Sequence, residues 1–200
     1  DVRIKFAACA IEPVSFRAPL KFGGRVIDKS FLINCTLTVE SRDGKHHATG
    51  FGSMPVGNIW AWPTDKVTGE QTEAAMKTFA EEIIELGSVC TEYGHPIDLS
   101  YHLSGEYHHT AKTLCQRMKL AETMPELAQL VAASPFDAAL HDAYGRLHNV
   151  NSYNALTSKF MNHDLSEYLD AQFKGEYLDK YTSREPKPKL PLYHLVGALD

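Results

Sequence analysis

Two stretches within the first forty residues alternate between apolar and other side chains, and this alternation limits the fold more than any other feature. The first stretch covers residues 2–10 and the second covers residues 31–40. The alternating apolar positions are Val2, Ile4, Phe6, Ala8 and Ala10 in the first, and Phe31, Ile33, Cys35, Leu37 and Val39 in the second. Because successive side chains of a strand point to opposite faces, a period of two predicts strands in a sheet with one buried face.

A turn signal follows the second stretch. Asp43 and Gly44 stand between Glu40 and a further extended segment that starts near Ala48. Asp-Gly pairs accept the positive φ angles of a tight hairpin turn, so the two flanking segments are predicted to pair antiparallel. With residues 2–10 as a neighbour, the expected sheet is a three-stranded antiparallel meander.

The rest of the chain has helical spacing. Thr68 or Gly69 is predicted to begin a helix that Gly87 ends, because apolar residues recur every three or four positions between them. Further helices are expected near residues 110–122, 125–132, 134–148, 153–161 and 165–173. The predicted fold class is therefore α+β, with the meander followed by a bundle of helices.

The helix over residues 134–148 has the clearest start signal. Ser134 fits its N-cap and Pro135 fits its first position, where a missing N–H costs nothing. Asp137, at the third position, is predicted to cap the helix and to accept a hydrogen bond from His141, four residues later. This structural role is preferred to a metal-ligand role for the pair.

Composition argues against several classes of protein. The 200 residues contain 20 Lys plus Arg against 25 Asp plus Glu, and this net charge of −5, without a basic stripe, argues against nucleic-acid binding. No apolar run reaches the roughly 18 residues of a membrane helix. The four cysteines form no C-x-x-C pair, which predicts reduced, mostly buried thiols of a cytoplasmic protein and no structural zinc site.

Neither the histidines nor any local motif marks a catalytic centre. The adjacent pairs His46–His47 and His108–His109 would diverge on a strand or a helix, so neither pair chelates an ion alone. The sequence has no H-E-x-x-H, P-loop, G-x-G-x-x-G or G-x-S-x-G pattern. The residues alone therefore give no local catalytic signature.

Two stretches rich in glycine and proline, residues 16–25 and 50–63, are predicted to be irregular loops. Both nevertheless contain large apolar side chains, among them Phe22, Phe51 and Trp60. Loops are normally polar, so these side chains either pack on their own domain or cover something outside it. The residues alone leave both alternatives open.

Three motifs follow one another along the chain. The first is Arg17-Ala18-Pro19-Leu20, and the second is the Asp43-Gly44 turn that leads to Gly50-Phe51-Gly52. The third is the run from Asp137 to Asp142 with Gly145. In this order they resemble the amino-terminal part of the enolase superfamily, and most closely its mandelate racemase/muconate lactonizing enzyme group, whose D-x-A-L-x-D-x-x-G helix is similar to the third motif.

This resemblance implies a capping domain over residues 1–188, followed in residues 189–200 by the first strand of a (β/α)-barrel that is otherwise missing from this chain. It also implies a Mg²⁺-dependent lyase or isomerase that abstracts the proton α to a carboxylate, as an acid-sugar dehydratase, racemase or cycloisomerase. The implied substrate is a small carboxylate such as an acid sugar, and the implied assembly is a homo-oligomer. In this family the Mg²⁺ ligands and catalytic bases lie on later barrel strands, so none is expected here.

The resemblance assigns substrate contacts to the two loops and to the first barrel strand. The expected residues are Arg17, Lys21, Phe22, Phe51, Met54, Trp60 and His194. Arg17 or Lys21 would meet an anionic group of the substrate, and the apolar side chains would exclude water. On the barrel strand, either Tyr193 or His194 would face the interior. The alternative from another class is a non-catalytic α+β binding domain that uses its aromatic loops as a partner surface.

Overall fold

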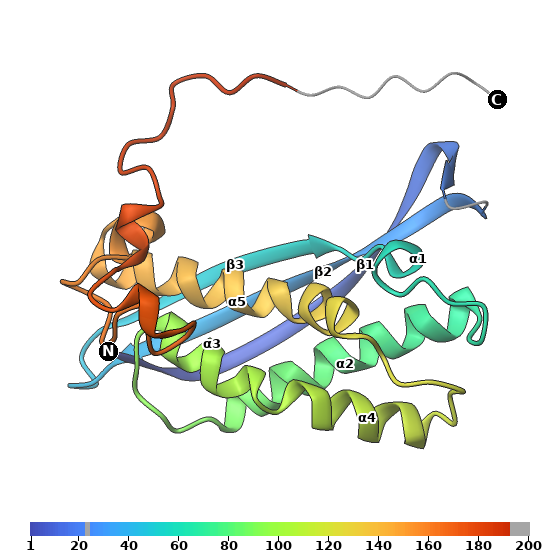
Figure 1. Cartoon of the computed structure of the whole chain (residues 1–200), viewed down its shortest axis with the longest axis horizontal. Helices are drawn as coiled ribbons and strands as arrows, with labels where there is room; N and C mark the ends of the chain where they lie inside the picture. The colour runs from blue at the N-terminus through green and yellow to red at the C-terminus, as the bar shows by residue number, and fades with distance from the viewer. Residues whose placement is uncertain (23–24, 193–200) are drawn as a thin grey trace.

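The computed structural model describes residues 1–22 and 25–192 and contains a three-stranded antiparallel sheet (Figure 1). Its strands are β1 (Val2–Phe22), β2 (Arg25–Ser41) and β3 (His47–Pro55), in the order β1-β2-β3. Gly44, with φ of 71°, donates its N–H to the Ser41 carbonyl at 2.9 Å and turns the chain between β2 and β3. The predicted meander and its Asp-Gly turn are confirmed.

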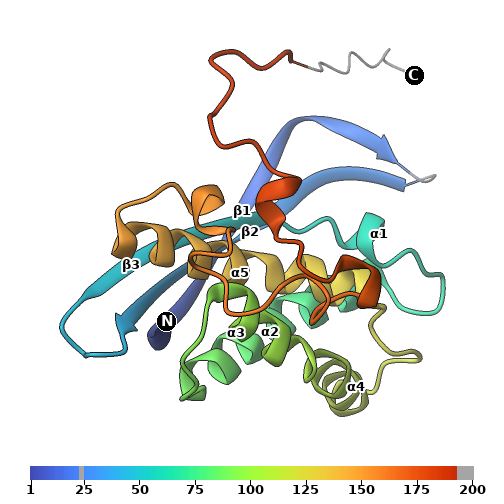
Figure 2. The same cartoon turned by 60° about the vertical axis from the view of Figure 1, so that its left-hand side comes forward.

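Helices cover one face of this sheet. They are α1 (Asn58–Ala61), α2 (Gly69–Val89), α3 (Pro96–Ser104), α4 (Tyr107–Arg117) and α5 (Glu126–His148), with short 3₁₀ turns η1 (Ser152–Ala155), η2 (Ala171–Phe173) and η3 (Leu178–Lys180). α5 packs on β3 and β2, α2 packs on β1, and α3 and α4 lie against these two helices (Figures 1 and 2). The predicted α+β class is confirmed.

The buried face of the sheet follows the predicted alternation in β2 but not throughout β1. Alternate β2 residues from Phe31 to Val39 are buried. In β1 the register shifts between Ile4 and Phe6, so the apolar series predicted for residues 2–10 changes face there. Phe6 is consequently 54% exposed, whereas Ala7 and Cys9 pack against the core.

The predicted loop over residues 16–25 is wrong, because residues 16–22 belong to β1 and β2 starts at Arg25. The register shifts between Ser15 and Leu20, which leaves the segment around Pro19 outside the regular pairing. Proline is tolerated there because β1 is an edge strand. β3 pairs with β2 only from Leu32 onward, so β1 and β2 continue alone as a two-stranded arm, residues 13–22 and 25–31, beyond the helical layer (Figures 1 and 2).

The predicted loop over residues 50–63 is also wrong in its first part, which belongs to β3. Its glycines let α5 approach the sheet. A Cβ atom on Gly50 would lie 2.3 Å from the Ala139 carbonyl oxygen, and one on Gly52 would lie 2.1 Å from the Pro135 carbonyl oxygen. The glycines are therefore required for close packing of a helix on a strand rather than for an irregular backbone.

α2 begins as predicted and ends later. The Thr68 hydroxyl accepts the Gln71 N–H at 3.2 Å, while the Gln71 side chain accepts the Thr68 N–H at 3.1 Å, which completes a capping box. Gly87 lies inside the helix, not at its end. A Cβ atom on Gly87 would lie 2.4 Å from the Phe136 ring, so packing against α5 accounts for this glycine.

α5 is one continuous helix where two were predicted, and Ser134 is not an N-cap. Pro135 lies inside α5 and has no N–H to donate to the Val131 carbonyl one turn earlier. The Ser134 hydroxyl donates to that carbonyl at 2.8 Å instead. The Ser-Pro pair, which is typical of a helix start, thus occurs in the middle of a helix because the serine replaces the lost hydrogen bond.

The remaining predictions for the helical part were partly wrong. α3 was not predicted; α4 ends at Arg117, before the expected residue 122, and 3₁₀ turns replace the helices expected over residues 153–161 and 165–173. Residues 183–192 are exposed and belong to no helix or strand, and residues 193–200 lie outside the described part. The boundary at residue 188 and the barrel strand therefore stay predictions.

Candidate functional site

A groove of about 220 Å³ lies where the two-stranded arm meets α1 and the turn before it. The chain turns back here because the Val56 N–H donates to the Phe31 carbonyl at 2.9 Å, and Val56 itself is buried. The lining residues are Phe16, Leu20, Ile27, Lys29, Ser30, Val56, Gly57, Asn58, Ile59 and Trp60. Two segments that are separate in sequence thus form one concave surface.

The segment that carries Trp60 is anchored on both sides. The Asn58 amide donates to the Gly69 carbonyl at 2.8 Å and to the Thr72 hydroxyl at 2.9 Å, which fixes α1 to α2. Trp62 is buried, and its indole N–H donates to the Glu122 carboxylate at 2.8 Å. Between these anchors the Trp60 side chain is 51% exposed.

The groove combines apolar walls with a cation. Phe16 and Leu20 on the arm are 38% and 49% exposed, and they face the groove together with Trp60. Lys29 supplies the positive charge among the lining residues. An apolar wall with one ammonium group suits an organic anion that has an apolar part.

The structure places the predicted site residues in different surroundings. Trp60 lines the groove. Arg17 and Lys21 are exposed on β1, and neither belongs to the described lining of the groove. Met54 is partly buried and packs against the core, which is the alternative that the sequence left open. Phe51 is 54% exposed on the opposite, solvent-facing side of the sheet, where it lies across from Thr36.

The side chains of two predicted site residues lie outside the part of the chain that the structure describes. The backbone of Phe22 pairs with Arg25 at the end of β1, and its side chain lies outside the described part. His194, like the Tyr193 alternative, lies outside the described residues. Sequence reasoning also missed Phe16, Leu20, Ile27 and Lys29. Ile27 and Lys29 continue the odd-numbered positions of β2, so the period-two pattern would have found them if it had been extended towards the arm.

A second polar cluster lies between α3 and α5. The Ser100 hydroxyl donates to Asp137 Oδ1 at 2.6 Å, and His141 Nε2 lies 3.8 Å from the same oxygen. Asp137 therefore bonds to α3 rather than capping its own helix, and the predicted hydrogen bond from His141 is too long. Because the serine proton points to the carboxylate, His141 is not arranged to activate Ser100 as a nucleophile.

The N-cap of α3 is a histidine, His95. Its Nδ1 accepts the Ile97 N–H at 3.2 Å, and its Nε2 donates to the Ala155 carbonyl at 3.1 Å, so both ring nitrogens are used by a neutral imidazole. Burial, and next the nearby His141, lower the pKa of His95 to about 4. Burial likewise lowers the pKa of His141 despite Asp137. These histidines serve the packing of α3 on α5.

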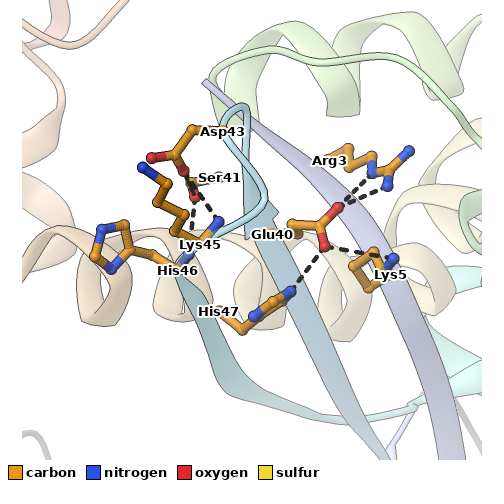
Figure 3. A network of polar contacts seen from close by, with 8 residues as sticks. All are labelled: Arg3, Lys5, Glu40, Ser41, Asp43, Lys45, His46 and His47. Atoms are coloured by element: carbon orange, nitrogen blue, oxygen red, sulfur yellow. Dashed lines mark hydrogen bonds and ion pairs between the residues drawn. The ribbon is translucent and has the colours of Figure 1, made fainter.

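A third polar network lies on the solvent-facing side of the sheet (Figure 3). Glu40 on β2 accepts hydrogen bonds from His47 Nε2 on β3 and from Arg3 Nε on β1, both at 2.8 Å, and Lys5 Nζ lies 3.4 Å away. The bonds from His47 and Arg3 lower the pKa of Glu40 to about 2. The network joins all three strands. His46 points away from His47, as predicted for neighbours on an extended segment.

The described residues do not fit a magnesium site. Within residues 1–22 and 25–192, no three Asp, Glu, His or Cys side chains gather closely enough to hold a metal ion. None of the helices within these residues has the length and apolarity needed to span a membrane.

Neither a family model nor a curated protein matches this sequence. Solved structures that match include an enolase from Bradyrhizobium in complex with magnesium and mandelic acid, at 18% identity and a TM-score of 0.44. A dipeptide epimerase from Enterococcus faecalis, in complex with Mg and the dipeptide L-Leu-L-Tyr, matches at 13% identity and a TM-score of 0.44. A mandelate racemase/muconate lactonizing protein from Herpetosiphon aurantiacus matches at 14% identity and a TM-score of 0.39.

Each of these matches covers 78% of this chain, and they cover 34%, 35% and 34% of the three structures in turn. The chain thus spans about a third of the length of the structures that it matches. They are members of the enolase/mandelate racemase/muconate lactonizing enzyme superfamily, the group that the sequence motifs resemble.

Proposed function

We propose that this chain is the capping part of an enzyme of the mandelate racemase/muconate lactonizing enzyme group, which abstracts the proton α to a carboxylate. The observation that carries the proposal is the groove between the arm and α1, where exposed apolar side chains surround a lysine. The three ordered motifs and the meander with its covering helices agree with it.

In this proposal the arm and the turn before α1 close over the substrate. Phe16, Leu20 and Trp60 contact its apolar part and exclude water, which strengthens electrostatic interactions inside the pocket. Lys29 pairs with an anionic group remote from the reacting carbon. The apolar walls favour a small carboxylate with an apolar distal group, whether the reaction is racemisation, cycloisomerisation or the dehydration of an acid sugar.

The proposal assigns proton abstraction and the binding of Mg²⁺ to a (β/α)-barrel that begins after residue 188. Since the described residues form no metal site, their part in the reaction is to bind and enclose the substrate. A cytoplasmic homo-oligomer is part of the same proposal.

Exchange of the substrate's α-proton tests this function without knowledge of the product. The protein that carries this chain together with its barrel is incubated in D₂O with a library of small carboxylates, with and without Mg²⁺, and mass spectrometry follows deuterium incorporation. We expect Mg²⁺-dependent incorporation for at least one acid. Absence of exchange across the library would contradict the proposal.

The role of the groove is tested with Trp60→Ala. We expect kcat/KM to fall by about tenfold or more while the melting temperature changes little, because the side chain is half exposed. Phe6→Ala is the matched control, since Phe6 is similarly exposed, at 54% against 51% for Trp60, but lies on the open face of the sheet. Equal losses of activity and melting temperature in Trp60→Ala would support packing within the domain instead.

A non-catalytic binding domain is the second candidate. The observation in its favour is the open face of the sheet, where Phe6 and Phe51 are each 54% exposed. This second candidate predicts that Phe6→Ala, and not Trp60→Ala, weakens binding of a partner. It also predicts that no carboxylate undergoes α-proton exchange.

A further inference from the structure

Two cysteines lie directly opposite each other in the sheet. Cys9 on β1 is the register partner of Cys35 on β2. Residues that are directly opposite in an antiparallel ladder point to the same face, and here this is the face that the helices cover. Cys35 is fully buried, and Cys9 is partly buried and packs against the same core. Both are free thiols.

Their separation suits a disulfide bond. Directly opposed Cα atoms in an antiparallel ladder are ~4.5 or ~5.5 Å apart, depending on the hydrogen-bonding pattern. Both spacings fall within the ~4.4–6.8 Å that disulfides span. On its other side Cys35 faces Gly52, which has no side chain and lies against the α5 backbone. The cross-strand side-chain neighbour of Cys35 is therefore Cys9.

We infer that Cys9 and Cys35 form a dithiol site that closes to a cross-strand disulfide when it meets a low-molecular-weight disulfide such as oxidised glutathione. The Cys9 thiolate attacks one sulfur of the oxidant and displaces one molecule of reduced thiol. The Cys35 sulfur then attacks Cys9 Sγ in the mixed disulfide and displaces the second. Two protein thiols are oxidised, one disulfide is reduced, and the two protons leave on the released thiols.

Access to this site comes from the edge of the sheet. β1 is an edge strand, and Cys9 is the more exposed partner, so Cys9 is the entry point and Cys35 the resolving thiol. Burial raises the pKa of Cys9, and it raises that of Cys35 to about 12. The reaction is therefore slow in the closed sheet.

The position of the bond gives it a consequence for the arm. Glu12 pairs with Leu32, the last β2 residue that also pairs with β3, so the cysteine pair lies just inside the point where the arm leaves the sheet. A disulfide there clamps the base of the arm. Any effect on substrate binding rests on the proposed function, whereas the disulfide itself does not.

Thiol titration and peptide mapping test the inference on the full 200-residue chain. After incubation with oxidised glutathione, removal of the reagent and unfolding, we expect free thiols to fall from four to two and Cys9 to be linked to Cys35. Cys90→Ser is the matched control, because Cys90 is a partly exposed cysteine outside the pair. It should still form the Cys9–Cys35 bond, whereas Cys9→Ser should form none.

A second reagent covers the case in which oxidation is hindered or a variant folds poorly. Phenylarsine oxide bridges two neighbouring thiols, and we expect one equivalent bound by the wild-type chain and loss of that binding in Cys9→Ala. Four free thiols after both treatments, a glutathione adduct that persists without a cross-link, or a link through Cys90 or Cys115 would overturn the inference.

Discussion

At the scale of single residues, His95 makes folding sensitive to acid. Its pKa in the folded chain is about 4, against an ordinary value of 6.5, so the unfolded chain binds this proton first as the pH falls. The stabilising contribution of the neutral imidazole is complete above pH 6.5, declines below it and is lost near pH 4. Because protonation of His95 is linked to unfolding, the free energy of unfolding should fall by roughly 2–3 kcal/mol between pH 6.5 and pH 4. Urea unfolding at several pH values measures it.

The matched variants separate His95 from other acid-sensitive groups. His95→Asn keeps a side-chain acceptor for the Ile97 N–H but cannot be protonated, so the pH dependence between 6.5 and 4 should flatten even though the chain is less stable overall. His102→Asn on the same helix is exposed and should retain the wild-type slope. An unchanged slope in His95→Asn would show that another group carries the acid sensitivity.

At the scale of elements, the contact between β3 and α5 depends on Gly50. Its absent Cβ atom would lie within 2.3 Å of both Ala143 N and the Ala139 carbonyl oxygen, which are backbone atoms and cannot rotate away. We expect Gly50→Ala to lower the free energy of unfolding by about 3 kcal/mol. Gly69→Ala is the control, because a Cβ atom there meets nothing within 4 Å. Equal unfolding midpoints for the two variants would show that α5 shifts without cost.

The same elements show what the sequence could predict. Alternation, a turn signal and a capping box are local, so the meander and the start of α2 followed from neighbouring residues. The predictions at Gly50, Gly87 and Pro135 were wrong. Glycine and proline usually indicate a loop, a helix end or a helix start, but here contacts with distant segments determine the local structure. Gly50 and Gly87 adjoin α5, while Ser134 replaces the hydrogen bond that Pro135 removes. A pattern of neighbouring residues does not predict such contacts between segments that are distant in the sequence.

The candidate site was predictable only in part, for a related reason. Trp60 was singled out because large apolar side chains are unusual in a stretch rich in glycine and proline, and in the structure it lines the groove. Lys29 was missed because its significance depends on the arm meeting the turn before α1, which joins residues about thirty positions apart. Phe51 was misplaced because the strand pleat turns it to the face opposite its glycine neighbours.

At the scale of the whole molecule, we expect this chain to fold on its own without catalysing the proposed reaction on its own. The sheet and the helices α1 to α5 share one continuous apolar core, while Leu156, Met161 and Leu165 form a second, small cluster, so the sheet and these helices should unfold in one cooperative transition. The described residues gather no metal-binding cluster, and the groove contains no acid or base beyond Lys29. Because the proposed function assigns the base and Mg²⁺ to the barrel, we expect this chain alone to show no turnover of any carboxylate in D₂O, with or without Mg²⁺, while circular dichroism shows it folded. Exchange catalysed by the folded chain would place the base within these residues, and the division of labour between cap and barrel would have to be abandoned.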